Sequence, residues 1–272
     1  MPQTDTAFDA ATALTRTDAG LTAELDPGWD VGGGVLNGGY LLAVAARAAA
    51  LDSPHPHPVA LSAGYLRAPA AGPATLSVTP GRAGRTLQHA GVLLSDAGGP
   101  ALTVQATAAT LTDAPPDFSV PAPAATPVED CPTLDELVGR DPAAATTPGL
   151  SRRVETRLDP ATSGWVRGCP GAEPLIRGWL RFADGRDPDP LGLVLFADAL
   201  PPTAWAVGRR GWAPTVQLQV LLRALPAPGW CLVEARAGEI AGGWLDEDYR
   251  IWDSTGRLVA QSRQLARAPR QT

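Results

Sequence analysis

From Trp29 to Asp52 the chain reads WDVGGGVLNGGYLLAVAARAAALD, with five glycines around one asparagine and then an Ala/Leu-rich segment. The spacing of the apolar residues predicts a helix from Gly38 to about Leu51. Every helix begins with backbone N–H groups that have no partner within the helix, at the positive end of its dipole. Because glycine has no side chain, a ligand oxygen or a neighbouring element can approach such a helix start closely.

These glycines do not match the known nucleotide phosphate loops. A P-loop needs GK[ST], and the chain contains no lysine, while a GxGxxG dinucleotide motif needs a hydrophobic strand where Leu25-Asp26-Pro27-Gly28 stands. Two interpretations remain. The helix start holds a carbonyl oxygen, or Gly32–Gly34 form a turn while Gly38 and Gly39 allow close packing against a neighbour.

The composition describes a globular chain with no nucleic-acid partner. The 272 residues are 44% hydrophobic and 18% charged, enough to bury a large core, and the net charge of −6 argues against a nucleic-acid surface. No signal peptide and no membrane-spanning segment is indicated. Cys131, Cys169 and Cys231 are scattered and odd in number, so we expect neither a disulfide framework nor a metal site. These features predict a cytoplasmic protein, and a homo-oligomer is compatible with them.

The two halves of the chain repeat each other at an offset of 156 residues. PVALSAGYLRA from Pro58 to Ala68 aligns with PTVQLQVLLRA from Pro214 to Ala224, and both end in Arg-Ala. The same offset, with a small slip near the end, aligns three further strand-like segments in the same order: GLTAEL with IRGWLR, PATLSVTPG with GWCLVEARA, and LLSDAGGPALTVQAT with IWDSTGRLVAQSRQ. Four matching segments in one order indicate an internal duplication.

Each half predicts a strand, a turn, an apolar helix and a run of strands of alternating polarity. In the first half the helix precedes strands near Val59–Arg67, Ala74–Thr79, Thr86–Ser95 and Ala101–Leu111. In the second half the helix LGLVLFADAL precedes strands near Thr215–Leu225, Trp230–Glu239, Gly242–Trp252 and Arg257–Ala266. One helix per curved antiparallel sheet is an α+β arrangement. Residues 112–150 are rich in Pro and Ala and predict a connecting segment on the surface, between halves 1–111 and 151–272.

A β-α-β-β-β-β unit made twice resembles the double-hotdog fold, and more narrowly the acyl-CoA thioesterase II type family. The resemblance covers most of the chain outside the linker. It is carried by GGVLNGGYLLA, by the GRAGRT turn from Gly81 to Thr86, and by DSTGRLVAQSRQLA from Asp253 to Ala266. It implies one wide antiparallel sheet around two central helices, and hydrolysis of acyl-CoA thioesters without a cofactor, with coenzyme A as part of the substrate.

The resemblance also implies a set of residues that holds the hydrolytic water. Matched to the family's motifs, these are Asp198 in FADAL, Thr215 in APTVQL and Gln264 in SRQLA. Asp198 lies in an apolar run, where an ionised carboxylate is costly unless it faces a cavity or a partner, and the alternative is a solvent-facing or helix-ending residue before Pro201. Thr215 alone reads as an ordinary strand residue. Residues three apart on a strand face opposite sides, so Gln261 is the alternative if Gln264 faces away.

Two further groups are candidates for substrate binding. We expect Asn37, Gly38 and Gly39 to form part of a corner that binds the thioester carbonyl, although related single-hotdog enzymes have histidine in place of Asn37, which places a catalytic role for Asn37 in doubt. Arg82 and Arg85 could meet the phosphates of coenzyme A or could be simply solvated.

Two rival functions use the same fold. A hotdog hydratase or dehydratase needs a histidine base, and His55, His57 and His89 are not placed at a helix start. A non-catalytic acyl-CoA-binding or assembly protein would keep the fold without the reaction, because fold does not imply function.

Overall fold

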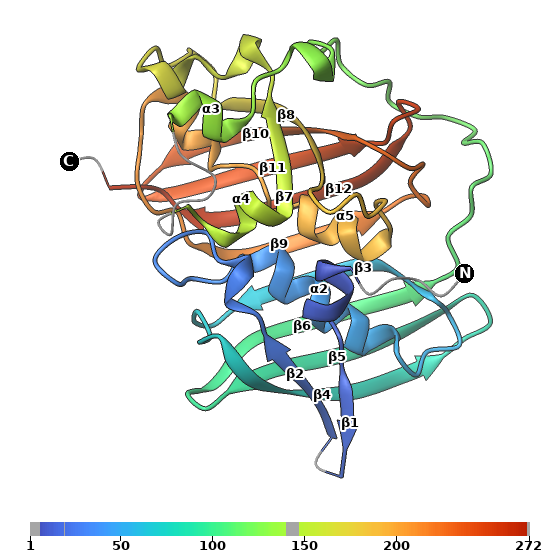
Figure 1. Ribbon diagram of the computed structural model, residues 1–272. Coiled ribbons are helices and arrows are strands. Elements are labelled where there is room, and N and C mark those ends of the chain that lie inside the picture. The colour runs from blue at the N-terminus through green and yellow to red at the C-terminus, as the bar shows by residue number, and fades with distance from the viewer. Residues whose placement is uncertain (1–5, 19, 140–146, 271–272) are drawn as a thin grey trace.

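The computed structural model describes residues 6–18, 20–139 and 147–270, and these residues form one 12-stranded antiparallel sheet (Figure 1). The N-terminal half contributes β1 (Thr15–Thr17), β2 (Gly20–Leu25), β3 (His57–Tyr65), β4 (Gly72–Ala83), β5 (Leu87–Asp96) and β6 (Gly99–Ala109). The C-terminal half contributes β7 (Val154–Leu158), β8 (Leu175–Phe182), β9 (Thr215–Leu222), β10 (Cys231–Ala241), β11 (Trp244–Trp252) and β12 (Leu258–Arg267).

The strand order confirms the predicted duplication. Across the sheet it runs β1-β2-β4-β5-β6-β3-β9-β12-β11-β10-β8-β7, so the second half repeats the first in reverse. The halves join where β3 pairs with β9, with Leu61 opposite Val220 and Ala63 opposite Leu218. All four of these side chains are buried and face the core. The fold is therefore the expected double hotdog, with one sheet shared by both repeats.

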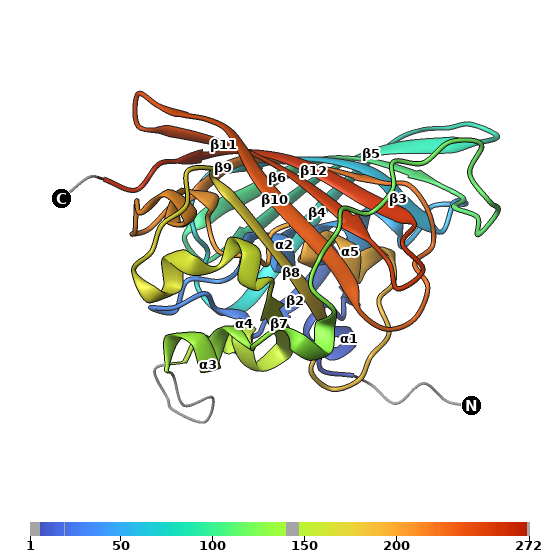
Figure 2. The same cartoon turned by 90° about the horizontal axis from the view of Figure 1, so that it is seen from above.

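The helices lie on one face of this curved sheet, as Figure 2 shows. They are α1 (Ala7–Ala11), α2 (Gly38–Ala50), α3 (Leu134–Val138), α4 (Gly149–Arg153) and α5 (Pro190–Phe196), with short 3-10 turns at Pro27–Trp29, Val128–Asp130, Pro160–Thr162, Gly164–Arg167 and Thr203–Val207. The two central helices, α2 and α5, contact each other. Small Ala side chains let the sheet close around α2, which is buried over most of its length. No helix in the described ranges has the length and apolar character needed to cross a bilayer.

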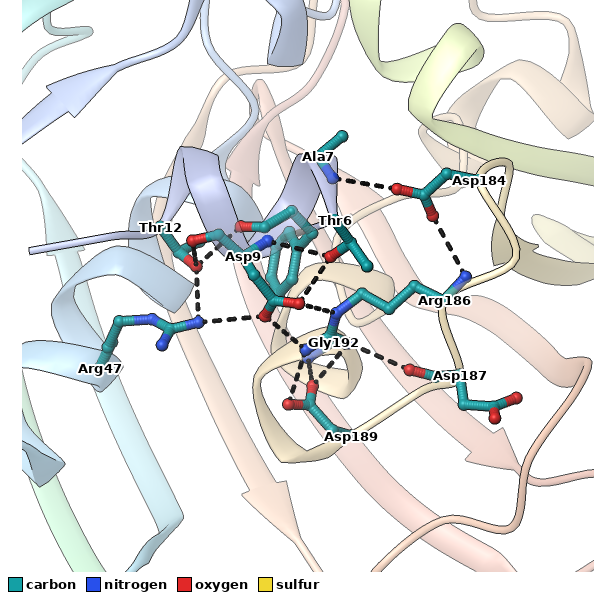
Figure 3. Close-up of polar contacts among 11 residues, drawn as sticks. Thr6, Ala7, Asp9, Thr12, Arg47, Asp184, Arg186, Asp187, Asp189 and Gly192 are labelled. Carbon is teal, nitrogen blue, oxygen red and sulfur yellow. Dashed lines mark hydrogen bonds and ion pairs between the residues drawn. The ribbon is translucent and has the colours of Figure 1, made fainter. Parts of the chain in front are cut away.

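A cluster of charged side chains fixes the start of α5 against the N-terminal half (Figure 3). The guanidinium of Arg186 donates to Asp9 at 2.9 and 3.0 Å and to Asp189 at 2.8 and 3.1 Å. Asp189 is also the N-cap of α5, since its Oδ1 accepts from the Gly192 N–H at 2.7 Å. Arg47 of α2 donates to Asp9 at 3.4 Å. One cluster therefore joins α1, α2 and α5.

The connecting segment contains structure that its composition did not predict. Within residues 112–150 the chain forms the capped helix α3, and α4 begins at Gly149. Leu134 of α3 and Leu150 of α4 pack against the core formed by the two halves. The segment therefore does more than cross the surface, because its second part covers one side of the helix layer.

Candidate active site

The start of α2 holds a carboxylate from the other half of the chain. Asn37 is the N-cap, and its Oδ1 accepts from the Tyr40 N–H at 2.8 Å. Its Nδ2 donates to the backbone oxygen of Asp198 at 2.8 Å and to Asp198 Oδ2 at 3.4 Å. The Gly39 N–H donates to the same Oδ2 at 2.8 Å. The asparagine and glycine of the opening motif are thus used to bind Asp198.

The two glycines are needed because the approach is so close. A Cβ at Gly38 would lie 2.8 Å from Asp198 Oδ2, and a Cβ at Gly39 would lie 2.8 Å from the Leu195 carbonyl oxygen and 3.0 Å from Asp198 Cβ. Both interpretations of the motif therefore meet here, since the glycines allow close helix packing and present an N–H to an oxygen. That oxygen belongs to the protein. The role predicted for Asn37 and Gly39 in binding a substrate carbonyl gains no support, because their donors are already used.

Asp198 reaches this position because α5 is short. The helix ends at Phe196, two residues before Asp198 and shortly before Pro201 and Pro202, which cannot continue a helix. The Ser262 hydroxyl on β12 donates to the Ala197 carbonyl at 3.1 Å and fixes the turn that follows the helix. Asp198 therefore ends a helix, as one interpretation of the sequence held, and it does so facing another helix start.

The surroundings of Asp198 favour its neutral form more than water would. The residue is partly accessible, but protein atoms surround its carboxylate, and this burial raises the pKa from 3.8 to about 7. The N–H groups of Gly39 and Gly38 oppose the rise, while the nearby negative charge of Glu247 adds to it. A carboxylate with this pKa can exchange a proton near neutral pH.

Thr215 and Gln264 form a hydrogen-bonded pair on neighbouring strands. Thr215, the first residue of β9, donates from Oγ1 to Gln264 Oε1 at 3.1 Å. Gln264 on β12 is buried and faces the helix layer, opposite Leu218 in the β9 register. Gln261 lies on the other face of β12 and does not line the cavity described below. The structure thus brings Gln264, not Gln261, to Thr215.

Glu247 belongs to the same network, although the sequence did not single it out. It lies on β11 directly opposite Gln264, and its Oε2 accepts from Gln264 Nε2. Its Oε1 accepts from the Thr203 N–H and hydroxyl, both at 2.6 Å. Burial raises the pKa of Glu247, and the bonds from Thr203 and Gln264 oppose that rise. Because Glu247 accepts from the Gln264 amide nitrogen, the amide oxygen turns toward Thr215.

A signal for Glu247 was present in the alternation of β11. Leu245, Glu247, Tyr249 and Ile251 occupy alternate positions, and the strand places all four on its buried face. In the stretch WLDEDYRIW, three acidic residues in a row, Asp246-Glu247-Asp248, suggest an exposed segment. Only the alternation of apolar residues on either side assigns Glu247 to the buried face. A charged residue in phase with three apolar ones indicates a buried polar group that has a partner.

A cavity of about 470 Å³ opens onto these residues. Asp198, Thr215 and Gln264 all line it, together with Asn37 and Gly38 from the first half. The rest of its wall is largely apolar and comes from both halves and the connecting segment, with contributions from Leu41, Tyr65, Leu134, Trp205 and Trp212. An apolar cavity with a few converging polar groups is typical of a small-molecule site, and this one can accept a hydrocarbon chain.

Arg82 and Arg85 lie at the opposite end of α2 from this cavity. They stand at the exposed end of the β4–β5 hairpin, where Gly84 O contacts His55 Nε2 at 3.0 Å just beyond the last turn of α2. The cavity begins at the first turn of the same helix, and the 13 residues of α2 span about 20 Å. Neither arginine is among the residues that line the cavity. His55, His57 and His89 also lie outside its wall.

Comparisons with known proteins identify the family and the fold of this chain. Residues 25–110 match the family model of the acyl-CoA thioesterase N-terminal domain, and residues 128–268 match that of the acyl-CoA thioesterase C-terminal domain. An uncharacterised protein of Mycobacterium tuberculosis is 35% identical over 270 residues, covering 91% of this chain and 90% of its own length.

Solved structures share the whole fold. One from Thermobifida fusca YX, whose assignment as a thioesterase II is provisional, is 35% identical, with a TM-score of 0.88 and 99% of both chains covered. The acyl-CoA thioesterase II TesB2 of Mycobacterium marinum is 17% identical, with a TM-score of 0.71 and coverage of 98% of this chain and 99% of its own. With both family domains matched in order, the chain belongs to the acyl-CoA thioesterase family and is a thioester hydrolase.

Proposed function

We propose that the protein hydrolyses acyl-CoA thioesters with Asp198 as the general base and that Thr215 and Gln264 orient the water. One observation carries this proposal. A carboxylate with a pKa of about 7 lies on the wall of an apolar cavity, together with the hydrogen-bonded pair of Thr215 and Gln264. A base whose pKa is near the working pH is ionised in a large fraction of molecules and still accepts a proton readily.

The hydrogen bonds leave one oxygen of Asp198 available. Oδ2 accepts from Gly39 and Asn37, whereas Oδ1 accepts no hydrogen bond from the described residues. The Thr215 proton is directed to Gln264 Oε1, so the lone pairs of the Thr215 oxygen remain free to accept. A water in the cavity can then donate one proton to Asp198 Oδ1 and the other to Thr215 or Gln264. This arrangement fixes the water before it reacts.

The reaction balances without a cofactor. Asp198 removes one proton from the water, and the water oxygen forms a bond to the thioester carbonyl carbon. The carbonyl oxygen of the tetrahedral intermediate then re-forms its double bond, and the C–S bond breaks. The proton held by Asp198 passes to the departing sulfur, which yields the free acid and coenzyme A. In these steps the protein supplies a base and a fixed geometry.

The apolar wall of the cavity supports an acyl chain as the part of the substrate that is buried. Coenzyme A extends outward from the thioester, and acyl-CoA is the partner that we propose. A cytoplasmic location and assembly into a homo-oligomer remain predictions from the sequence. Arg82 and Arg85 do not line the cavity, and a role for them in binding the coenzyme A phosphates remains a prediction from the sequence.

The test is to incubate the purified protein with acyl-CoAs of increasing chain length and follow the release of free thiol. We expect hydrolysis by the wild type and a loss of about 10²- to 10⁴-fold in Asp198→Asn, because asparagine keeps the shape but cannot accept a proton. Full activity in Asp198→Asn would rule out this base. If the wild type binds acyl-CoA in calorimetry but releases no thiol, the non-catalytic binding function is the correct one.

A further inference from the structure

The proposed reaction requires a donor that the residues described so far do not supply. As water adds to the carbonyl carbon, negative charge develops on the carbonyl oxygen and needs a preorganised N–H or O–H group. The N–H groups of Gly38 and Gly39 at the α2 start both act on Asp198, and the N–H of Tyr40 donates to Asn37. The N–H of Leu41 donates to the Asn37 carbonyl oxygen. The carbonyl of a bound thioester must find its donor elsewhere in the cavity.

Tyr249 carries an unused hydroxyl in this cavity. It lies on β11 two residues after Glu247, on the same inward face; it lines the cavity and is 1% exposed. Among the described residues its hydroxyl has no hydrogen-bond partner, and only burial and the charges of Glu247 and Asp198 act on it, although buried tyrosine hydroxyls usually find a partner. The other two tyrosines follow that rule. Tyr40 Oη donates to the Ala11 carbonyl at 2.9 Å, and Tyr65 Oη donates to the Gly38 carbonyl at 2.8 Å.

The position of Tyr249 places it close to the reacting groups. Its β12 partner in the register is Ser262, which binds the Ala197 carbonyl immediately before Asp198. Burial and the negative charges of Glu247 and Asp198 keep the pKa of Tyr249 well above its usual value of 10. The hydroxyl therefore carries its proton throughout the neutral range. It is close enough to both carboxylates to feel their charge, yet it is bonded to neither.

We propose that Tyr249 is a catalytic residue whose hydroxyl donates a hydrogen bond to the carbonyl oxygen of the bound thioester. The bond strengthens as that oxygen becomes negative in the tetrahedral intermediate, and the proton stays on the tyrosine throughout. This inference rests on the proposed hydrolysis and adds its electrostatic part. Asp198 acts on the water, while Tyr249 acts on the carbonyl.

The first test is Tyr249→Phe, which removes one oxygen atom and keeps the ring. We expect kcat to fall about 10²- to 10³-fold, the usual cost of losing one oxyanion donor, with little change in KM. The melting temperature should stay the same or rise, because no hydrogen bond within the protein is lost. Tyr40→Phe is the matched control. It loses bonds to Ala11 and Asp26 outside the cavity, so its melting temperature should fall while the folded enzyme keeps its kcat.

The second test reads the hydrogen bond directly. The acyl-CoA that the wild type hydrolyses fastest is labelled with ¹³C at the thioester carbonyl and bound to Asp198→Asn, in which turnover is slowed by about 10²- to 10⁴-fold. The infrared frequency of the carbonyl should be lowered on binding and should move back toward its value in an apolar solvent when Tyr249→Phe is added. A structural role for Tyr249 would leave this frequency unchanged.

The outcomes separate the two proposals. If Asp198→Asn is inactive while Tyr249→Phe has the kcat of the wild type, the base is retained and the role of Tyr249 is overturned. If Tyr249→Phe loses stability and activity together, with no change in the carbonyl frequency, the hydroxyl is structural. If the wild type releases no thiol from any acyl-CoA, the proposed hydrolysis fails and this inference fails with it.

Discussion

Asp198 shows how one side chain is kept between two protonation states. Burial alone would make an aspartate a poor base at neutral pH by leaving it protonated, and a helix start alone would make it a weak base by lowering its pKa. Here the two effects act on one carboxylate, and burial prevails, giving a pKa of about 7. The glycines of the α2 start set this balance because they let their N–H groups reach the carboxylate.

This pKa predicts the pH dependence of the reaction. The base must be ionised, so kcat/KM should fall about tenfold per pH unit below pH 7 and level off above it. The same shift affects stability with the opposite sign. A carboxyl group whose pKa is raised on folding contributes stability that is fully present below pH 3.8 and is lost progressively until the pH has risen through 7. Asp198→Asn should therefore raise the melting temperature at pH 8, and do so less at pH 5.

Both halves of this prediction are measured on the same two proteins. Initial rates between pH 5 and 9 give the kinetic pKa, and thermal unfolding at pH 5 and pH 8 gives the stability difference. An inflection near pH 4, or an asparagine variant that is less stable than the wild type at pH 8, would contradict the assigned pKa.

At the scale of elements, much of the fold could be predicted from the sequence. The predicted helix 38–51 is observed as Gly38–Ala50, and the predicted strand 59–67 as His57–Tyr65. These elements are long and have a regular hydrophobic period, and the duplication shows the same order of elements twice in the sequence. The five-residue helix α3 was not predicted, because it is too short to show a helical period. Glu247 was missed for a different reason, since its role depends on the partner strand that lies beside it.

The pair of β11 and β12 provides an element-scale prediction. In Glu247→Gln, an amide that can present a nitrogen faces the Gln264 amide nitrogen, so Gln264 is no longer held with its oxygen toward Thr215. We expect kcat to fall about tenfold or more. The negative charge of Glu247 raises the pKa of Asp198. Its removal in Glu247→Gln should therefore also shift the inflection of kcat/KM to lower pH.

Asp248→Asn is the matched control for this variant. It changes the next residue of β11, whose side chain is on the exposed face, and it should leave the inflection where it is. The comparison is a pair of pH–rate profiles. An inflection that moves equally in both variants, or that moves to higher pH in Glu247→Gln, would argue against the charge of Glu247 as a cause of the raised pKa of Asp198.

On the scale of the whole molecule, the site exists only because the two repeats pack against each other. Asn37 and Gly39 come from the first repeat, while Asp198, Thr215 and Gln264 come from the second. The family's motifs indicated these residues one by one. Their assembly depends on the contact between α2 and α5, which no local pattern specifies. The cluster around Arg186 holds the start of α5 in place, so it should contribute to the stability of the whole chain.

Arg186→Gln tests this contribution. The Arg186 side chain is 7% exposed and lies 5.1 Å from the ring centres of both Phe8 and Phe182. Its loss leaves Asp9 and Asp189 without their main partner. We expect the free energy of unfolding to fall by about 2–4 kcal/mol, toward the lower end because both carboxylates are partly exposed. Arg16→Gln breaks an ion pair with Asp52 on the open surface and should cost at most about 0.5 kcal/mol.

The pH dependence of unfolding shows whether the ion pair between Arg186 and Asp9 accounts for the stability lost in Arg186→Gln. Burial would raise the pKa of Asp9, but hydrogen bonds from Arg186 and Thr6 outweigh it, and the pKa is lowered overall. Stabilisation from a lowered pKa is present above the ordinary value of 3.8 and is lost as the pH falls through the lowered one. In urea unfolding, the deficit of Arg186→Gln should therefore be larger at pH 7 than at the lowest pH where both proteins fold. An equal deficit at both pH values would assign the effect to lost packing on the two phenylalanine rings instead.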